Sequence, residues 1–351
     1  MQRAFGFSLL VISTLAGLSL SAGHRSAVAE EITFFRIGTG STAGTYYPVG
    51  ALIANAISNP PGSRACEAGG SCGVPGVIGA AVATQGSVAN INAIATGALE
   101  SGLAQSDTVD AAIKGTGPFA NGGRRDTIRV VANLYPESLH LVVRKEAGIE
   151  SIDDLRGKRV SLDTKGSGTR VIASLVLDAF GIGEDALIAA DYPPGEAVDM
   201  MFAGEVDAFF LVAGYPTRAV SELARVGMAT LLPIADERVF RLLENHPYLA
   251  VDQIPADAYA EVGETDTVSV GAQWVVDADL EEEFVYRLTE ALWHPNNRPL
   301  LDSGHDKARL IQLETALKGV SAPLHPGAER YYRERDMVTG APPRPKRRPP
   351  T

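Results

Sequence analysis

The order of apolar and polar positions predicts strands that alternate with helices along most of the chain. The predicted strands cover residues 32–37, 77–83, 102–105, 128–134, 139–144, 160–162, 208–211, 229–233 and 268–276. The predicted helices cover residues 47–57, 88–98, 108–113, 170–180, 197–203, 217–224, 280–293, 308–317 and 326–333, with a single helical turn at 151–155. Strands and helices that alternate in this way form parallel sheets covered by helices, so the pattern predicts an α/β fold.

The first 29 residues have the features of a secretory signal peptide. Arg3 precedes an apolar stretch, Ala4–Leu20, and the segment ends in the small residues Ala27-Val28-Ala29. This order predicts cleavage after Ala29 and a protein exported to the periplasm. A membrane anchor that stays attached is the alternative, although the apolar stretch is short and is interrupted by polar residues.

Charge and length narrow the class of protein. The chain has 351 residues and a formal net charge of −11, and a chain of this length predicts two domains rather than one small core. An acidic body disfavours nucleic acid as a partner, because phosphate binding requires basic surface. Residues 338–351 are rich in proline and arginine, which predicts a disordered basic tail. We expect the protein to act as a monomer.

Two cysteines, Cys66 and Cys72, lie close together in a segment rich in glycine. In an exported protein such a pair predicts one disulfide that closes a small surface loop. A metal site would need further ligands, and the six histidines are scattered without metal-binding spacing. The sequence therefore predicts neither a metal site nor a cofactor.

A loop dense in glycine, serine and threonine follows the first predicted strand, at residues 38–46. Its glycines, Gly38, Gly40 and Gly44, are spaced G-x-G-x-x-x-G, one residue too far apart for a dinucleotide-binding fingerprint. The loop lacks the lysine of a phosphate-binding P-loop and the G-x-S-x-G pattern of a hydrolase. A nucleotide cofactor and a serine hydrolase are thus both disfavoured.

Three loops of similar polar character follow predicted strands and lead into helices. The free N–H groups of a first helical turn, together with nearby hydroxyl groups, bind carboxylates well. Because ligands in α/β folds sit at the carboxyl ends of strands, these loops are the candidate ligand-binding site. The candidate residues are Ser41, Thr45 and Tyr46 in the first loop, Gln105 and Ser106 in the second, and Ser167, Gly168 and Thr169 in the third.

The loops occur in an order that resembles TAXI-type solute receptors, the periplasmic binding proteins of one class of TRAP transporter. The motifs that carry this similarity are GTGS at 38–41, GTYYPVG at 44–50, GSVAN at 86–90, LAQSD at 103–107, GKRVS at 157–161 and GSGT at 166–169. The resemblance extends from Ile32 to Met337. The loop with the cysteine pair, residues 59–76, departs from it, because a short connection is expected there.

The resemblance implies a two-lobed periplasmic binding protein fold with two hinge crossings and a ligand cleft between the lobes. Residues 30–136 and 267–337 would form lobe one, and residues 137–266 would form lobe two. The crossings would lie near 134–136 and 267–271. The resemblance also implies a TRAP-type membrane permease as the partner and a small carboxylate or amino acid, such as glutamate or 2-oxoglutarate, as the ligand.

Four further residues have open roles once this resemblance is considered. Tyr215 could add to the edge of the ligand site or could belong to the core or rim. Asn90 could touch ligand, although a structural role at its helix start is favoured. Arg170 could pair with a ligand carboxylate or lie solvated. Asp107 is interpreted as a helix N-cap, but it could meet the ammonium group of an amino acid.

Two other functions share the same sequence features. The lobes could belong to a sensory receptor whose closure is detected by a membrane histidine kinase. They could also form an exported hydrolase, although no serine, histidine and acid pattern supports catalysis. We therefore expect a binding protein for transport, not an enzyme.

Overall fold

Strands and helices alternate through residues 32–338, the part of the chain that the computed structural model describes. The strands are β1 (Thr33–Gly38), β2 (Ser58–Asn59), β3 (Val74–Pro75), β4 (Val77–Val82), β5 (Ser101–Gln105), β6 (Ile128–Arg144), β7 (Arg159–Ser161), β8 (Ile188–Ala190), β9 (Ala208–Ala213), β10 (Ala229–Leu231), β11 (Leu249–Ile254) and β12 (Thr265–Asp277). The helices are α1 (Tyr46–Ile57), α2 (Ser87–Ala95), α3 (Ser106–Lys114), α4 (Gly168–Ala179), α5 (Pro194–Phe202), α6 (Arg218–Arg225), α7 (Glu237–Asn245), α8 (Glu282–Leu292), α9 (Arg298–Gly304) and α10 (Pro326–Arg333). The predicted signal segment and residues 339–351 of the predicted tail lie outside the described residues.

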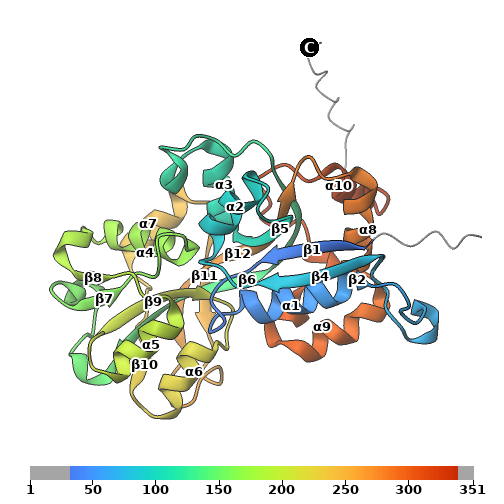
Figure 1. Ribbon diagram of the computed structural model, residues 1–351. Helices are drawn as coiled ribbons and strands as arrows, with labels where there is room; N and C mark the ends of the chain where they lie inside the picture. The colour runs from blue at the N-terminus through green and yellow to red at the C-terminus, as the bar shows by residue number, and fades with distance from the viewer. Residues whose placement is uncertain (1–31, 339–351) are drawn as a thin grey trace, which may run out of the picture. The chain divides into compact units, whose positions relative to one another are not determined.

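Ten of the described strands form one sheet, in the order β4-β1-β5-β12-β6-β9-β7-β8, with β10 paired to β6 and β11 to β12. The central strands β6 and β12 are long and run antiparallel to each other. On one side of them β1, β4 and β5 form what we call the first half, together with α1, α2, α3, α8, α9 and α10 (Figure 1). On the other side β7–β11 and α4–α7 form the second half.

The sheet is mixed, and this corrects the expectation of purely parallel sheets. β1 pairs in parallel with β4 and β5, and β7 pairs in parallel with β8 and β9. The two crossing strands are antiparallel to their neighbours on both sides. β6 and β12 are antiparallel to each other because they cross between the halves in opposite directions.

Some of the predicted elements differ from those in the structure. The strands predicted at 128–134 and 139–144 are one strand, β6, in which Pro136 lies exposed opposite Gly271. A proline usually marks a strand end or edge, which explains the predicted break. The helix predicted at 308–317 is instead two short 3-10 turns, η7 (Asp306–Leu310) and η8 (Leu313–Thr315). The helical turn predicted at 151–155 is confirmed as a 3-10 turn, Ile152–Leu155, and a capping box between Ser151 and Asp154 begins it.

Four apolar clusters form the core of the described residues, one on each face of each half. The β9 strand shows how sequence periodicity builds two of them, because its alternate residues face opposite sides of the sheet. Phe210 and Val212 pack under α4 and α7, whereas Phe209 and Leu211 pack under α5 and α6. The other two clusters lie in the first half, where Trp274 of β12 is fully buried.

The Asn90 side chain forms hydrogen bonds to three separate segments of the first half. Its Nδ2 donates to the carbonyl oxygens of Thr39 at 2.7 Å and Leu103 at 2.8 Å. Its Oδ1 accepts from the hydroxyl of Thr84 at 2.7 Å, and the side chain is fully buried. Asn90 therefore has the structural role that was favoured, and it fixes the ends of two strands next to each other.

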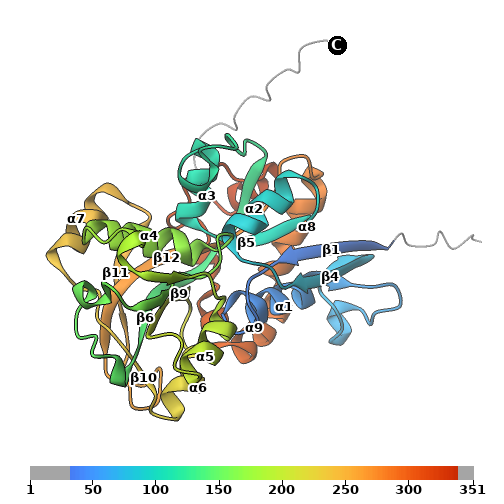
Figure 2. The ribbon, with the colours of Figure 1, turned by 60° about the vertical axis from the view of Figure 1, so that its left-hand side comes forward.

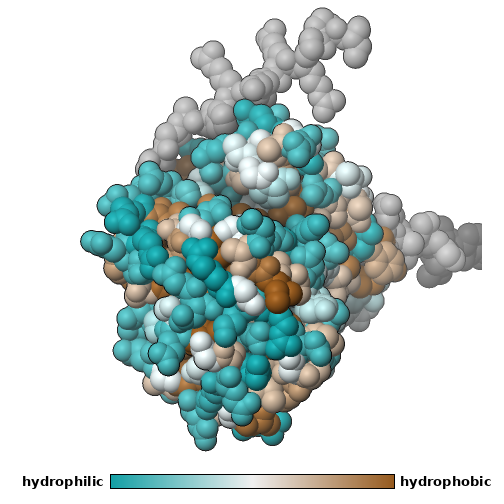
Figure 3. All heavy atoms as spheres, turned by 90° about the vertical axis from the view of Figure 1, so that its left-hand side faces the viewer, coloured by the Kyte–Doolittle hydropathy of each residue, from teal (hydrophilic) through white to brown (hydrophobic). Residues whose placement is uncertain are grey.

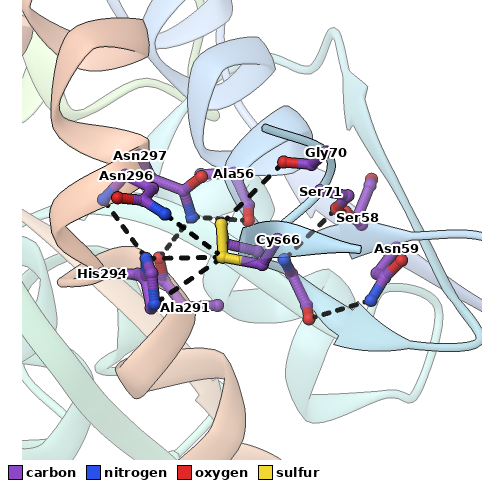
Figure 4. Close-up of a disulfide and its surroundings, with 12 residues drawn as sticks. Ala56, Ser58, Asn59, Cys66, Gly70, Ser71, Ala291, His294, Asn296 and Asn297 are labelled. Atoms are coloured by element: carbon purple, nitrogen blue, oxygen red, sulfur yellow. Dashed lines mark hydrogen bonds between the residues drawn. A yellow bond between two sulfur atoms is a disulfide. The ribbon is translucent and has the colours of Figure 1, made fainter. Parts of the chain in front are cut away.

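The predicted Cys66–Cys72 disulfide is present and closes the loop between β2 and β3. Figure 4 shows how this loop is held against the end of α8, where the Cys66 sulfur lies 3.8 Å from Nε2 of His294 and 3.5 Å from Nδ2 of Asn296. The two sulfurs and His294 thus gather in one place. Because the sulfurs are bonded to each other, they cannot act as thiolate ligands for a metal ion.

The surface of the second half is mostly hydrophilic in the view of Figure 3, with apolar residues in small scattered groups. Among the described residues, no helix combines the length and the apolar character that crossing a bilayer requires. The described residues belong to a single compact unit, so the two halves pack as parts of one body.

Replacing Asn90 with alanine is expected to lower the free energy of unfolding by about 2–4 kcal/mol, because it removes two buried hydrogen bonds to the carbonyl oxygens of Thr39 and Leu103 and leaves a cavity. Urea unfolding followed by circular dichroism measures the change. Asn92→Ala is the matched control, because Asn92 is only half-buried and its amide oxygen accepts from Arg125. The control should cost about 1 kcal/mol or less. Equal losses in the two variants would contradict the role given to Asn90.

Candidate functional site

A cavity of about 330 Å³ lies between the two halves. Its walls come from the loops that follow β1, β4 and β5 in the first half and from those that follow β7, β8 and β9 in the second. The lining residues are Gly40, Ser41, Gly44, Thr45, Tyr46, Thr84, Gln85, Gly86, Ser87, Gln105, Glu137, Asp163, Thr164, Ser167, Gly168, Thr169, Pro193, Pro194, Leu211, Val212 and Ala213. A cavity of this size suits a small molecule of a few heavy atoms.

Helix N-termini converge on this cavity from both halves. Tyr46, Ser87, Gly168 and Pro194 are the first residues of α1, α2, α4 and α5, and all four line the cavity wall. The first N–H groups of a helix have no partner within the helix, and the helix dipole places partial positive charge there. The cavity is therefore built to attract negative charge without any arginine or lysine in its described lining.

Most of the residues expected to bind ligand meet at this cavity. Those on its wall are Ser41, Thr45, Tyr46, Gln105, Ser167, Gly168 and Thr169. Ser106 is buried at the start of α3 and does not line the cavity. Tyr215 also lies outside it, and its ring instead packs against Nζ of Lys307 at 3.4 Å.

Several hydrogen bonds cross from one half to the other around the cavity. The Thr45 hydroxyl donates to the carbonyl oxygen of Gly214 at 2.5 Å. The amide of Ala89 in α2 donates to the carbonyl of Gly166 at 3.0 Å, and a longer bond of 3.3 Å joins Ala219 to Ala43. The two halves are thus in direct contact, so the structure shows a closed arrangement.

Two glycines make this close approach possible. Gly86 has φ of +109°, a conformation that other residues rarely adopt. A Cβ atom at Gly168 would lie 2.4 Å from Oε1 of Gln105 and 2.7 Å from Oγ of Ser87, both in the opposite half. Gly168 therefore leaves room for the second half to close on the first.

Two acids in the cavity wall were not predicted from the sequence. Glu137 of β6 is 1 % exposed, and burial raises its pKa to about 8, with the negative charge of Asp107 adding to the rise. Asp163 follows β7 and is 6 % exposed, and burial raises its pKa to about 6. Near pH 7 Glu137 is therefore mostly protonated and can donate to a ligand oxygen, whereas Asp163 is mostly ionised and can pair with a cationic group.

The two acids differ in whether the sequence could have revealed them as site residues. Asp163 is a non-glycine residue with φ of +68°, a conformation often found at functional sites. Its position just after a predicted strand could have suggested a site residue. Glu137 lies inside a continuous strand, and only the pairing of β6 with β12 brings it to the cavity. Sequence position alone could not have found it.

The cavity also contains buried polar atoms without hydrogen-bond partners in the described residues. They are the Tyr46 hydroxyl, Oε1 of Gln105 and Oε2 of Glu137. Buried polar groups are usually hydrogen-bonded, and leaving one unpaired costs about 1–3 kcal/mol. Three such atoms at one cavity indicate that a polar ligand or bound water completes their bonding.

The structure gives the contacts of Arg170 and Asp107, whose roles the sequence left open. Arg170 forms ion pairs with Glu184 and Asp191 and donates to the carbonyl oxygen of Asp163 at 3.1 Å. It therefore supports the loop of Asp163 from outside the cavity. The N-cap of α3 is Gln105, so the interpretation of Asp107 as an N-cap is wrong.

Replacing Glu137 with glutamine is expected to remove part of the pH dependence of stability. The folded protein holds this proton to about pH 8, whereas the ordinary pKa of a glutamate is 4.5. The wild type should therefore lose stability as pH rises between these values. Relative to Glu137→Gln, the loss from pH 5 to pH 8 should be on the order of 3 kcal/mol.

Urea unfolding at both pH values tests this expectation. Glu150→Gln, which removes an exposed acid, should follow the wild type at both. If Glu137→Gln keeps the wild-type pH dependence, Glu137 does not carry the raised pKa.

Comparison with solved structures identifies the fold. MatC from Rhodopseudomonas palustris, solved with bound malate, is 16% identical, with a TM-score of 0.53, and the match covers 88% of this chain and 99% of MatC. A protein from Bordetella bronchiseptica is 15% identical, with a TM-score of 0.51 and coverage of 89% and 85%. The alkanesulfonate-binding protein of Xanthomonas axonopodis pv. citri, bound to MOPS, is 17% identical, with a TM-score of 0.48 and coverage of 87% and 85%.

The similarities to MatC and to the Bordetella protein confirm the expected two-lobed α/β fold. The sequence also matches a family model over nearly the whole described region. Residues 37–335 match the NMT1-like family, and the chain belongs to this family.

Proposed function

We propose that this protein is an exported solute-binding protein that captures a small carboxylate between its two halves and delivers it to a membrane transporter. The observation that carries the proposal is the convergence of the α1, α2, α4 and α5 N-termini on one closed cavity. Helix N-termini bind carboxylates through free N–H groups and the helix dipole. MatC, which shares the fold, was solved with a carboxylate, malate.

The two cavity acids favour an amino acid over a simple dicarboxylate. Glu137 keeps its proton near pH 7 and can donate to one ligand carboxylate, whereas the mostly ionised Asp163 would repel a second carboxylate and could pair with an ammonium group. A ligand with one carboxylate and one ammonium group satisfies both features of the cavity. Glutamate fits this description better than 2-oxoglutarate, although both were implied by the resemblance to TAXI-type receptors.

The lining also supports binding rather than catalysis. Neither histidine nor cysteine is among the described lining residues, so Ser41 and Ser167 have no imidazole base beside them there. Nucleophilic catalysis by serine needs such a base within hydrogen-bond reach. We therefore assign the serines to ligand contact.

The sequence supports the partner and the location that we propose. The predicted signal peptide supports a periplasmic location, and the motifs that resemble TAXI-type receptors make a TRAP-type permease our proposed partner. The family match is broader than that group of receptors. We also propose that the halves correspond to lobe one at 30–136 and 267–337 and lobe two at 137–266, hinged where β6 and β12 cross.

Glutamate is expected to bind about tenfold or more tightly than glutarate at pH 7, because glutarate lacks the ammonium group that pairs with the cavity acids. Isothermal titration calorimetry on the purified exported protein measures both affinities, and taurine and malate extend the panel to other anions. Asp163→Asn should reduce the difference between glutamate and glutarate. Asp178→Asn, which removes an exposed acid of α4 outside this cavity, should preserve it.

The outcomes separate two parts of the proposal. Equal affinity for glutamate and glutarate would contradict ammonium recognition by the acids. The absence of heat and of thermal stabilisation with every acid in the panel would contradict carboxylate capture itself.

Replacing Gly168 with alanine is expected to weaken ligand affinity by about tenfold or more, because the added methyl group separates the halves where they close. Titration calorimetry with the best ligand of the panel measures the loss. Gly263→Ala is the matched control, because a Cβ atom there meets nothing within 4 Å. Unchanged affinity in Gly168→Ala would show that closure at this point is not needed for binding.

A further inference from the structure

A second and larger cavity lies between the two halves, away from the one described above. Its volume is about 630 Å³. The first half contributes residues of α3 and of the turn η2 (Gly117–Phe119), and the second half contributes α4 and the connection from α7 to β11. Figure 2 shows α3 and α4 on facing sides of this junction. The lining residues are Asp107, Ala111, Thr116, Gly117, Pro118, Lys165, Arg170, Val171, Ser174, Leu175, Asp178, Glu184, His246 and Tyr248.

Asp107 gives this cavity a buried acid. Its side chain is 3 % exposed. One carboxylate oxygen accepts from the Thr108 hydroxyl at 3.3 Å. The other, Oδ2, is buried and has no hydrogen-bond partner in the described residues. An unpaired buried carboxylate is costly, so this atom marks a place where a donor or a cation is missing.

The opposite wall offers aromatic and apolar surface. His246 and Tyr248 stack on each other with ring centroids 5.5 Å apart. Val171 and Leu175 lie on the face of α4 that lines the cavity, and Pro118 lies across from them. Such surface suits an apolar or aromatic group, and a tyrosine ring also attracts cations.

The other charged residues that line the larger cavity do not favour an anion as its ligand. Arg170 already forms ion pairs with Glu184 and Asp191. Lys165 is exposed, and the exposed Asp178 and Glu184 lie on the same wall. Asp107 is thus the one deeply buried charged group among the described lining residues, and it has no positive partner there.

We propose that this cavity is a second ligand site, for an organic ammonium compound with an apolar or aromatic body. The ammonium group binds Asp107, and the body packs between Tyr248 and the apolar face of α4. The ligand would touch both halves, and it would therefore favour their closed arrangement. This cavity shares no lining residue with the carboxylate cavity, and the proposal does not rest on the function proposed above.

Titration with 2-phenylethylamine tests the proposal on the full exported chain. Saturable binding of one molecule is expected, with 2-phenylethanol, the uncharged analogue, binding about tenfold or more weakly. Asp107→Asn should weaken amine binding by about tenfold or more. Asp178→Asn removes an exposed acid from the same wall and should change the affinity by about twofold or less.

Two further variants keep the test informative. Ser174→Phe fills the cavity from α4 and should abolish amine binding while thermal unfolding remains cooperative. Asp163→Asn alters the carboxylate cavity and should leave amine affinity unchanged. The proposal is overturned if 2-phenylethylamine does not bind the wild type, or if 2-phenylethanol binds equally well. It is also overturned if binding survives Asp107→Asn but is lost in Asp163→Asn.

Discussion

The antiparallel pairing of β6 with β12 is the interaction on which the rest of the structure depends. The ladder runs from Asp277 opposite Ile128 to Ser269 opposite Ser138, with two register shifts on the way. The first half attaches to it through β5, and the second half attaches through β9. Because both halves share these strands, one ladder fixes the position of every loop that lines the cavity. The apolar clusters on the two faces of each half keep that ladder covered.

The same ladder carries Glu137, the more deeply buried of the two cavity acids. Glu137 lies on β6 opposite Val270 of β12 and is almost fully buried. A deeply buried acid lowers stability, and strongly perturbed acids of this kind are concentrated at functional sites. Asp107, whose charge adds to the raised pKa of Glu137, lines the larger cavity. The junction of the halves therefore holds buried acids in both cavities. In the smaller cavity, the helix N-termini supply partial positive charge beside those acids.

The sequence predicted the parts of the fold that depend on local order. The loops at 38–46 and 166–169 could be recognised because glycine, serine and threonine stand between an apolar strand and a helix start. The capping box at Ser151 could be recognised for a similar reason. Features that depend on distant pairing were missed, including the continuous β6, the place of Glu137 and the burial of Asp107. Helix α7 was also missed, because only Val239 of its residues is buried, which leaves little apolar pattern to read.

The central claim is that the cavity holds a small molecule with a carboxylate and an ammonium group between the two halves. Mass spectrometry of the small molecules released when freshly purified exported protein is denatured tests this claim most directly. The account predicts one amino acid, released in nearly equimolar amount, and its loss when the protein is unfolded and refolded before the measurement. A released compound without a carboxylate, or a preparation that binds no amino acid and releases none, would contradict the account.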